Sequence, residues 1–496
     1  MRTQPIAASP MEFGMSFGRS GGPRPEARPF RMLVMGDFSG RSARSVDESA
    51  RLAERTVHGI DIETMDDVMK RMNVHISIAG QNLPLRSLDD LHPDALYQSL
   101  HLFAEGRVLR AKLRVAATAA QAERELDEWL GAPTKIPETP APQAQPPSTD
   151  LMSQLLGGPA RVNAPSLASN ADAFIRSIMG NTGTVMPASA GALPRLDDRL
   201  SLFMRGVLRD PAFREIESSW RGAHWLINRL ELSDDLSLHL LDVSAAELAA
   251  DMAAHPDPRS GGLAKAVASG GVGHEAFHVI LSLHTCPPDA ASVRLAGWLA
   301  RALPGALFCG CAHPGLTGCP SFGTHPDADQ WTQPISADAR EAWQTLCADA
   351  GANALVLAAP RIILRQPYGA SSDEIDSFRF EEFVPEELGS AAAHEHYLWG
   401  GGSLAVGALL GNRFTDSGWD IDPEAGGSVG DLPVHTWNLG GQAQVKPCAE
   451  AWLSDRSTTR LVASGLVPVA SIRGRDAVLI GTLQTPGGKP PKPAWV

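Results

Sequence analysis

Short apolar runs alternate with stretches of helical periodicity along most of the chain. Met32–Met35 is an apolar run closed by Gly36 and Asp37, which predicts a buried strand that ends in a turn. In the second half the same pattern predicts strands over Leu236–Asp242, Ala276–Leu283, Ala306–Ala312 and Ala352–Leu357, with a helix over Ala291–Leu303. Strands that alternate with helices are typical of a three-layer α/β domain with a mostly parallel or mixed sheet.

Residues 29–130 show the same alternation on a smaller scale. Thr64–Met72 is expected to form a helix, because Thr64 can cap it, acidic residues fill its first turn and basic residues its last. Short strands are expected on either side, over Ile60–Glu63 and Val74–Ile78. The pattern therefore predicts a small α/β domain that ends near Trp129.

Two consecutive helices are expected after residue 190. The first begins near Leu193, and the second begins at Asp210-Pro211, since proline is favoured in the first turn of a helix. In the second helix, Trp220 and Trp225 bracket Arg221 and His224. This stretch has no nucleophile beside a base and no glycines that could cradle a phosphate, so we expect it to bury tryptophan and present arginine.

Prolines concentrate between Gly131 and Thr149, which is typical of an extended, semi-rigid linker. The linker divides two α/β domains. The expected organisation is a flexible arm (1–28), a small α/β domain (29–130), a proline-rich linker with short helices (131–192), a larger α/β domain (193–485) and a disordered tail (486–496).

A short amphipathic helix is expected within this linker, over Asp150–Gly157. Its apolar positions follow helical spacing: Leu151, Met152, Leu155 and Leu156. A helix this short is marginally stable alone. It is therefore expected either to dock on the body of the protein or to be held out for the groove of a partner, and the pattern favours neither.

Composition narrows the classes of function. The chain has 496 residues, 43% of them hydrophobic, and a formal net charge of −13, which argues against binding nucleic-acid phosphates. No stretch approaches the roughly 20 apolar residues of a membrane span, and Met1–Gly22 lacks the apolar core of a secretion signal. Six cysteines are too few for a disulfide scaffold in so long a chain. We therefore expect a cytoplasmic protein with reduced thiols.

The most tempting chemical cluster is a set of potential zinc ligands: Cys309, Cys311, His313, Cys319 and His325. In a strand Cys309 and Cys311 would share one face. However, no second Cys-x-x-Cys pair follows, so a chance cluster is the better interpretation. Cys309, Cys311 and His313 remain weak metal candidates.

No other motif predicts chemistry. The string His394-Glu395-His396 lacks the histidine pair at i and i+4 of helix-borne zinc sites, and we expect it on a helix surface ahead of packed residues that include Trp399. The chain has neither a Walker lysine motif nor a Gly-x-Ser-x-Gly elbow. We expect no cofactor and no enzyme activity.

Two polar pairs have competing interpretations. Arg361 and Arg365 flank the apolar Ile362–Leu364. They could pair with carboxylates at an interface or form a solvated pair at a sheet edge, and these carry equal weight. Asp37 and Ser39, at the carboxyl end of a predicted strand, could line an active-site rim. A turn in which both satisfy local backbone groups is favoured.

Several of these strings match one family in family order. In the first half, Pro29–Gly40, Asp66–Met72 and Ser87–Leu91 resemble the small sheath subunit of the type VI secretion system (TssB, or VipA). The second half resembles the large sheath subunit (TssC, or VipB). The matching strings there are Glu217–Gly222, Pro360–Gly369, Phe378–Glu382, Tyr397–Gly400, Gly430–Thr436, Lys446–Arg456 and Gly465–Pro468.

The resemblance implies a structural and mechanical protein. In the family, small and large subunits pair one to one and stack into a contractile tube around an inner tube. An AAA+ unfoldase recycles the spent sheath by gripping a short helix near the N-terminus of the large subunit. Leu151–Leu156 looks like that helix, which shifts the expectation modestly towards a partner-facing segment. The expected partners are other sheath or baseplate components, further copies of this chain and an unfoldase.

The chain departs from the family in two ways. Both subunits occur in one polypeptide, so pairing becomes intramolecular and the linker sets equal stoichiometry. The large-subunit half is also expected to lack the inner domain at its C-terminal end, which in the family faces the inner tube and exchanges strands with neighbours.

Three hypotheses follow. The first is a sheath-like subunit or sheath-associated accessory. The second is an adaptor or regulator that binds sheath, baseplate or unfoldase without polymerising, and the third is a zinc-dependent enzyme. The matching strings carry residues expected to pack helix against sheet, or to lie where the two halves meet: Trp220, Arg221, Trp225, Arg361, Arg365 and Trp399.

Overall fold

The computed structural model describes residues 28–44, 46, 48–131, 191–269 and 276–495. Its centre is a nine-stranded sheet in the order β11-β15-β14-β8-β7-β6-β1-β5-β2. β1 (Phe30–Gly36) contains the apolar run that predicted a strand, and all of its residues are buried. A strand covered on both faces needs apolar side chains on both, which explains the continuous run.

Parallel strands form the middle of this sheet, and antiparallel strands close its edges. β1 lies between β5 (Leu236–Asp242) and β6 (Val279–Cys286). The sheet continues in parallel through β7 (Leu307–Ala312), β8 (Leu355–Ala359) and β14 (Val467–Ser471). The antiparallel edge strands are β15 (Val478–Ile480) and β11 (Gly427–Val429) on one side and β2 (Val57–Ile60) on the other. The predicted α/β class with a mixed sheet is confirmed.

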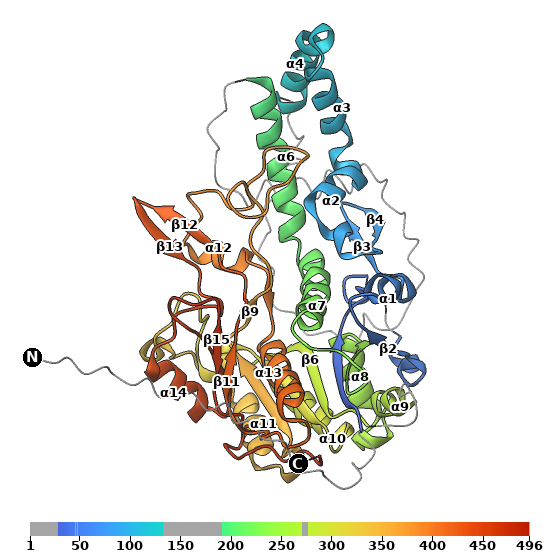
Figure 1. Cartoon of the computed structure of the whole chain (residues 1–496), viewed down its shortest axis with the longest axis vertical. Coiled ribbons are helices and arrows are strands. Elements are labelled where there is room, and N and C mark those ends of the chain that lie inside the picture. Colours follow the sequence, from blue (N-terminus) through green and yellow to red (C-terminus); the bar gives the residue numbers. More distant parts are fainter. Residues whose placement is uncertain (1–27, 45, 47, 132–190, 270–275, 496) are drawn as a thin grey trace, which may run out of the picture.

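Helices cover both faces of the sheet, which gives the three layers (Figure 1). Met32 and Val34 of β1 face one core, and Leu33 and Met35 face the other, as the pleat of a strand requires. The first core is covered by α7 (Pro211–Ile227) and α13 (Gly402–Ser417). The second is covered by α8 (Ala245–Ala254), α9 (Gly262–Ser269), α10 (Ala290–Ala302) and α11 (Ala337–Ala348).

The remaining elements extend from one end of the sheet (Figure 1). The helices among them are α1 (Met65–Met72), α2 (Pro93–Ser99), α3 (Ala104–Leu113), α4 (Ala116–Gly131), α6 (Ala192–Arg209) and α12 (Ala391–His396), while α14 (Asp455–Ala463) lies beside the sheet. The small sheets are β3 (His75–Ile78) with β4 (Gln81–Pro84), β9 (Ile362–Ile363) with β10 (Trp399–Gly400), and β12 (Thr436–Leu439) with β13 (Gln442–Val445).

The main sheet is not divided between the two halves of the chain. We call residues 30–131 the first segment and residues 191–495 the second segment. β1 and β2 belong to the first segment, yet both pair only with strands of the second within the described part of the chain. The sequence predicted two α/β domains divided by a linker, and in the structure the first strand of the small domain completes the larger sheet. The residue boundaries expected for the domains stay predictions.

Residues 486–495 do not form the disordered tail that was predicted. The backbone N–H groups of Lys492 and Ala494 donate to Asn353 O at 2.8 Å and Gly305 O at 3.0 Å. The indole Nε1 of Trp495 donates to His278 O at 2.8 Å. The prediction weighed the glycines and prolines of this stretch, but the tryptophan near its end holds it against the body.

Several predictions fall outside the described residues. These are the arm before residue 28, nearly all of the linker, and the helix with Leu151, Met152, Leu155 and Leu156. Within the described residues, no helix combines the length and the hydropathy that crossing a membrane requires.

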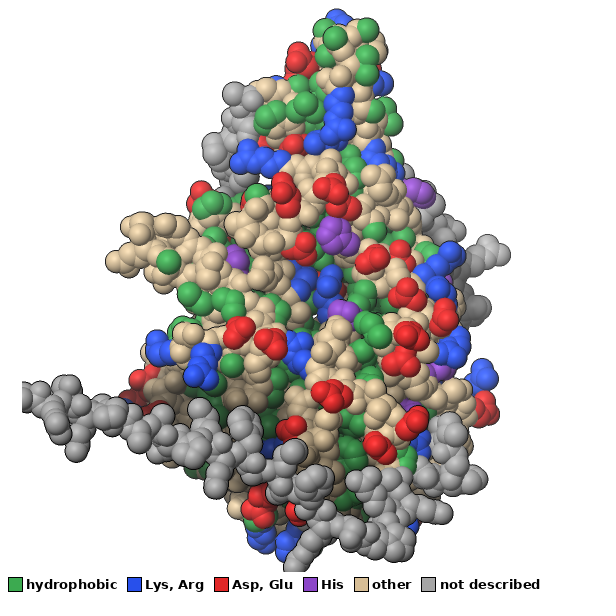
Figure 2. Space-filling view, viewed as in Figure 1, with side chains coloured by type: hydrophobic (Ala, Val, Ile, Leu, Met, Phe, Trp, Pro, Cys, Tyr) green, Lys and Arg blue, Asp and Glu red, His purple; other side chains and the backbone are tan. Residues whose placement is uncertain are grey.

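The exposed surface carries both signs of charge. On the face drawn in Figure 2, acidic and basic side chains are interspersed. The β12–β13 hairpin projects from the body and its two strands hold no charged residue. It exposes the apolar side chains of Leu439 and Val445.

Candidate functional site

The junction between the two segments begins with the backbone of β1. β1 pairs with β5 from Phe30↔Leu236 to Gly36↔Asp242, and with β6 from Met32↔Val279 to Met35↔Ser282. Both edges of the strand are therefore occupied by the second segment. Removing the first segment would leave unpaired backbone groups on two buried strands, which is costly because such groups need partners.

Trp220 of α7 joins the two segments directly after β1. The side chain is fully buried, and its Nε1 donates to Phe38 O at 2.8 Å. Its ring packs edge-on against Phe38, with ring centroids 5.2 Å apart. Trp220 thus belongs to the second segment while its hydrogen bond and ring contact lie in the first.

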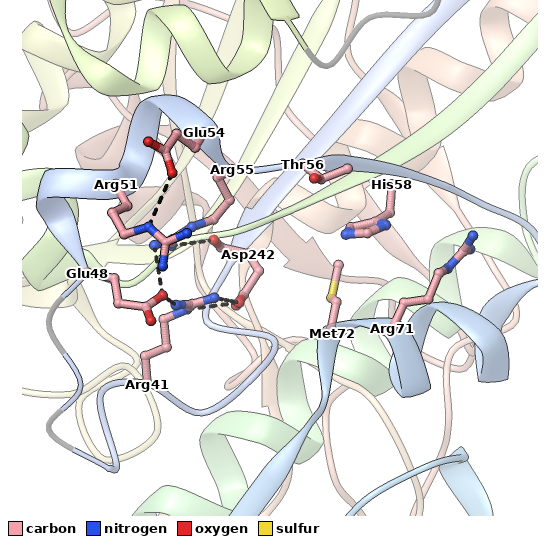
Figure 3. Close-up of a pocket in the computed structure, with 10 residues that line it drawn as sticks. All are labelled: Arg41, Glu48, Arg51, Glu54, Arg55, Thr56, His58, Arg71, Met72 and Asp242. Carbon is pink, nitrogen blue, oxygen red and sulfur yellow. Dashed lines mark hydrogen bonds and ion pairs between the residues drawn. The ribbon is translucent and has the colours of Figure 1, made fainter.

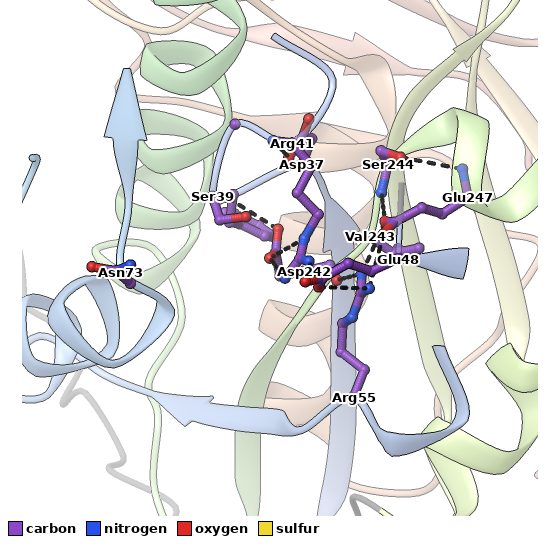
Figure 4. Close-up of polar contacts among 12 residues, drawn as sticks. Asp37, Ser39, Arg41, Glu48, Arg55, Asn73, Asp242, Val243, Ser244 and Glu247 are labelled. Atoms are coloured by element: carbon purple, nitrogen blue, oxygen red, sulfur yellow. Dashed lines mark hydrogen bonds and ion pairs between the residues drawn. The ribbon is translucent and has the colours of Figure 1, made fainter. Parts of the chain in front are cut away.

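Asp242, at the end of β5, binds the loop that follows β1 (Figure 4). Its Oδ1 accepts from Ser39 N at 3.0 Å. Its Oδ2 accepts from Arg41 Nε at 3.0 Å and from Arg41 Nη2 at 2.8 Å. A guanidinium that donates twice to a carboxylate fixes orientation as well as charge.

Asp37 binds the backbone of the same loop, as the favoured interpretation of this residue expected. Its carboxylate accepts from Arg41 N at 2.8 Å and Ser42 N at 2.7 Å, as the predicted turn requires. The Ser39 hydroxyl does not satisfy a local backbone group as predicted, because it is buried without a hydrogen-bond partner among the described residues. The loop is therefore shaped by Asp37 from within and anchored by Asp242 from the second segment.

Glu247 makes a second carboxylate anchor in the first turn of α8 (Figure 4). Arg55 donates to its two oxygens at 2.9 and 2.8 Å, and also to Asp242 O at 2.8 Å. Glu247 closes a capping box with Ser244, through bonds of 2.9 and 3.2 Å. Burial raises the pKa of Glu247, but the bond from Arg55 and the capping bond outweigh this and lower the pKa below its usual value.

Contacts between the two segments continue beyond the main sheet, among the elements that extend from its end. Asp94, in α2, accepts from Asp376 N at 3.0 Å and Ser377 N at 2.9 Å. Arg110 of α3 pairs with Asp197 of α6. Hydrogen bonds and ion pairs between the segments therefore run from the sheet to the projecting helices.

A buried ion network lies beside the junction, around Glu217 of α7. Arg365 Nε donates to Glu217 Oε1 at 2.8 Å, and Arg365 Nη1 donates to Glu382 Oε2 at 2.7 Å. Arg221 Nε also donates to Glu217 Oε1 at 2.8 Å, and its Nη2 donates to the Tyr368 hydroxyl at 2.7 Å. Burial raises the pKa of Glu217, but Arg365 and Arg221 together hold it below the usual value.

Arg361 makes a second network with Glu450. Its Nε donates to Glu450 Oε1 at 2.8 Å, and despite burial this charge holds the pKa of Glu450 at about 2. The interpretation of Arg361 and Arg365 as a solvated pair is wrong: both bind buried carboxylates of their own chain. Both arginines do pair with carboxylates, as the other interpretation held, and these carboxylates belong to their own chain.

His394 is buried rather than on a helix surface as predicted. Its Nδ1 lies 2.7 Å from Lys446 Nζ, and its carbonyl accepts from Trp399 Nε1 at 2.8 Å. The ring of Trp399 is in turn stacked beneath Arg361, 5.7 Å from its guanidinium carbon. The short α12 is held inward by these contacts, which residue spacing alone does not reveal.

Trp225 is buried beneath the guanidinium of Arg229, whose carbon lies 4.1 Å from the ring centroid. The sequence-derived residues thus separate into four places: Trp220 at the junction, Trp225 beneath Arg229, Arg221 and Arg365 around Glu217, and Arg361 with Trp399 around Glu450.

The zinc candidates are engaged in other contacts. Cys311 Sγ lies 3.3 Å from Ser282 O and 3.1 Å from Ser403 Oγ, and His313 Nδ1 accepts from Gly315 N at 3.0 Å. Burial raises the pKa of the Cys309 and Cys311 thiols, which disfavours the thiolate that binds metals. Among the described residues, no group of three or more His, Cys, Asp or Glu side chains is arranged to hold a metal ion.

Sequence reasoning missed the ion pairs of the junction. Arg41, Arg55, Asp242 and Glu247 are the residues concerned. A signal existed only for Glu247, since Ser244 three residues earlier matches a capping box. Its partner Arg55 is separated from it by 192 positions, which no local pattern can bridge.

Comparisons with known families match both segments. The VipB family model, described as a tail sheath N-terminal domain, matches residues 191–486. The type VI secretion system VipA family model matches residues 24–135. A curated relative, the type VI secretion system sheath protein TssC1 of Pseudomonas aeruginosa, is 27% identical over 305 residues. That match covers 59% of this chain and 60% of the relative, so the chain spans less than two thirds of the relative's length.

Proposed function

Since the VipB match covers more than half of its length, the chain belongs to the type VI secretion sheath family, and we propose that it is a structural component of that secretion apparatus. In this proposal it acts by protein–protein assembly rather than by turnover, in the cytoplasm. Residues matching the small and the large sheath subunit are fused in one polypeptide.

The observation that carries the proposal is the position of β1. This strand comes from the VipA-matching residues, and it is paired on both edges by strands of the VipB-matching residues. The two matched parts therefore act as one building block, as an assembled subunit pair would. Fusion makes their ratio one to one in every molecule.

The surface supports further assembly. A two-stranded hairpin is marginally stable on its own, yet β12–β13 projects with Leu439 and Val445 exposed. Burial of such side chains against another sheath or baseplate component, or a second copy of the chain, would stabilise both.

Electron microscopy of the purified protein, alone and with sheath and baseplate components of the same apparatus, tests the proposal. Tubules formed by the protein alone would identify a sheath subunit. Discrete particles at the ends of a sheath or on a baseplate would identify an accessory or adaptor. A protein that remains monomeric and binds none of these components would contradict the proposal.

An AAA+ unfoldase is a further proposed partner, through the apolar residues of Asp150–Gly157. The support is the sequence pattern of Leu151, Met152, Leu155 and Leu156. Leu155→Asp should abolish retention of the unfoldase in a pull-down, because a carboxylate would enter an apolar contact. Ser153→Asp, on the polar side of the pattern, is the control and should retain it. Equal retention by both variants would remove the unfoldase from the proposal.

A further inference from the structure

A polar cavity of about 230 Å³ opens between the first segment and the end of β5 (Figure 3). A water molecule occupies roughly 30 Å³ in the liquid, so the cavity has room for several. Four arginines and a histidine are among its lining residues. The cavity is lined by Arg41, Glu48, Arg51, Glu54, Arg55, Thr56, His58, Arg71, Met72 and Asp242.

The three carboxylates that bind Arg41 and Arg55 differ in how easily each could give up its ion pair to a competing anion. Asp242 and Glu247 are 6% and 1% exposed and anchor the junction. Glu48 is 42% exposed, pairs with Arg41 Nη1 and lies 3.8 Å from Arg55 Nη2. Withdrawing Glu48 into water would leave no buried carboxylate unpaired, whereas withdrawing Asp242 or Glu247 would break the junction.

The other two arginines of the cavity, Arg51 and Arg71, form a weak ion pair or none among the described residues. Arg51 pairs with Glu54 at 3.2 Å, and both side chains are largely exposed, so this pair contributes little stability. Arg71 is exposed and has no ion pair among the residues that the structure describes. Figure 3 shows Arg71 beside His58, across the cavity from Arg41 and Arg55.

We propose that this cavity binds a small phosphate-type oxyanion, which takes the place of the Glu48 carboxylate between Arg41 and Arg55. The carboxylate of Glu48 already demonstrates the geometry, since one anionic group reaches both guanidinium groups. Phosphate oxygens suit the forked donors of arginine, and a phosphate carries more charge than a single carboxylate. Met72 is the one large apolar residue of the lining, which disfavours an apolar ligand.

Binding of an anion in this cavity would affect the junction between the two segments. Arg41 and Arg55 use their remaining donors on Asp242 and Glu247 of the second segment. An anion that orders both arginines would therefore also stabilise the contact between the segments.

Calorimetric titration of the full chain with pyrophosphate at pH 7.5 and low salt tests the proposal. Glu48→Gln keeps the size of the side chain and removes the competing charge, so it should bind pyrophosphate about five-fold more tightly than the unaltered chain. Arg71→Gln and Arg51→Gln should each weaken binding by a few-fold. Arg456→Gln, in a surface pair with Asp329 outside the cavity, is the control and should leave the affinity unchanged.

Parallel titrations with inorganic phosphate and with ADP distinguish a free oxyanion from the phosphoryl groups of a nucleotide. Tighter binding of ADP than of pyrophosphate would identify a nucleotide, and the reverse order would identify the free ion. The proposal is overturned if Glu48→Gln, with an unchanged melting temperature, binds pyrophosphate no better than the unaltered chain. It is also overturned if Arg456→Gln weakens binding as much as Arg71→Gln, because that would indicate unspecific attraction.

Discussion

Replacing Arg365 by methionine is expected to lower the free energy of unfolding by about 3–5 kcal/mol, the range seen when one partner of a buried ion pair is removed. Arg365 donates to both Glu217 and Glu382, and both carboxylates are buried. The variant keeps the two acids and loses the cation between them. Denaturant unfolding of the variant and the unaltered chain at pH 7 measures the difference.

The difference should shrink as the pH falls towards 4.5. In the unaltered chain the pKa of Glu217 lies below its usual value despite burial, because Arg365 and Arg221 favour its charged form. The stability from this group is therefore present above the pKa of the unfolded chain and is lost as the pH falls through the lower, folded pKa. In the variant, protonation instead relieves a poorly paired buried charge. A penalty that does not change between pH 7 and 4.5 would contradict this account.

Arg456→Met is the matched control for Arg365→Met. Arg456 pairs with Asp329 on the surface, where both side chains are more than half exposed. Surface pairs contribute roughly 0–1 kcal/mol, so the control should unfold at nearly the same denaturant concentration as the unaltered chain. Equal losses in the two variants would show that the buried network has no special role.

Trp220→Ala is expected to destabilise the protein by about 3–5 kcal/mol, as large-to-small substitutions in cores do. The indole is fully buried and it also donates to Phe38 O, which would be left without this donor. Because Phe38 belongs to the first segment, the substitution should loosen the junction as well as the core. Thermal unfolding followed by circular dichroism measures the loss.

Trp220→Phe separates packing from the hydrogen bond. It retains an aromatic ring against Phe38 and removes the N–H donor, so a smaller loss of about 1–3 kcal/mol is expected. If alanine and phenylalanine variants unfold alike, the packing of Trp220 contributes little and the account of the junction is wrong in this respect.

The sequence predicts the helices that begin with clear caps. α7 starts at Pro211 after Asp210, whose carboxylate accepts from Ala212 N and Phe213 N, each at 3.0 Å. The predicted start at Asp210-Pro211 is confirmed because both the cap and the proline act locally. β5 and β7 are also found where apolar runs predict them, over Leu236–Asp242 and Leu307–Ala312.

Strand ends that depend on neighbours are less predictable. β6 was expected over Ala276–Leu283 and lies over Val279–Cys286. Its apolar pattern stops at Leu283, but Thr285 and Cys286 still pair with β7. β2 was expected over Ile60–Glu63 and lies over Val57–Ile60, where its bonds to β5 stabilise it. Pairing with a neighbouring strand sets the ends of β2 and β6, and residue periodicity does not show which residues pair.

The junction could be predicted only as far as its tryptophan. The position of Trp220 in a helix and its burial follow from the sequence, and the idea that the two halves meet near it was one of the alternatives. The ion pairs of Asp242 and Glu247 join residues about 200 positions apart. Likewise, Arg365 and Glu217 are separated by 148 positions. Their charges were visible, but their partners are chosen by the topology of the sheet.

In the proposed function the first and second segments form one building block through β1, and limited cleavage tests this most directly. A site for a specific protease is inserted between residues 132 and 190, the chain is cut completely, and the products are separated by size-exclusion chromatography under native conditions at micromolar concentration. The account predicts that the two pieces elute together at the position of the uncut chain, because β1 stays paired on both edges. Elution of two separate, folded pieces would contradict it.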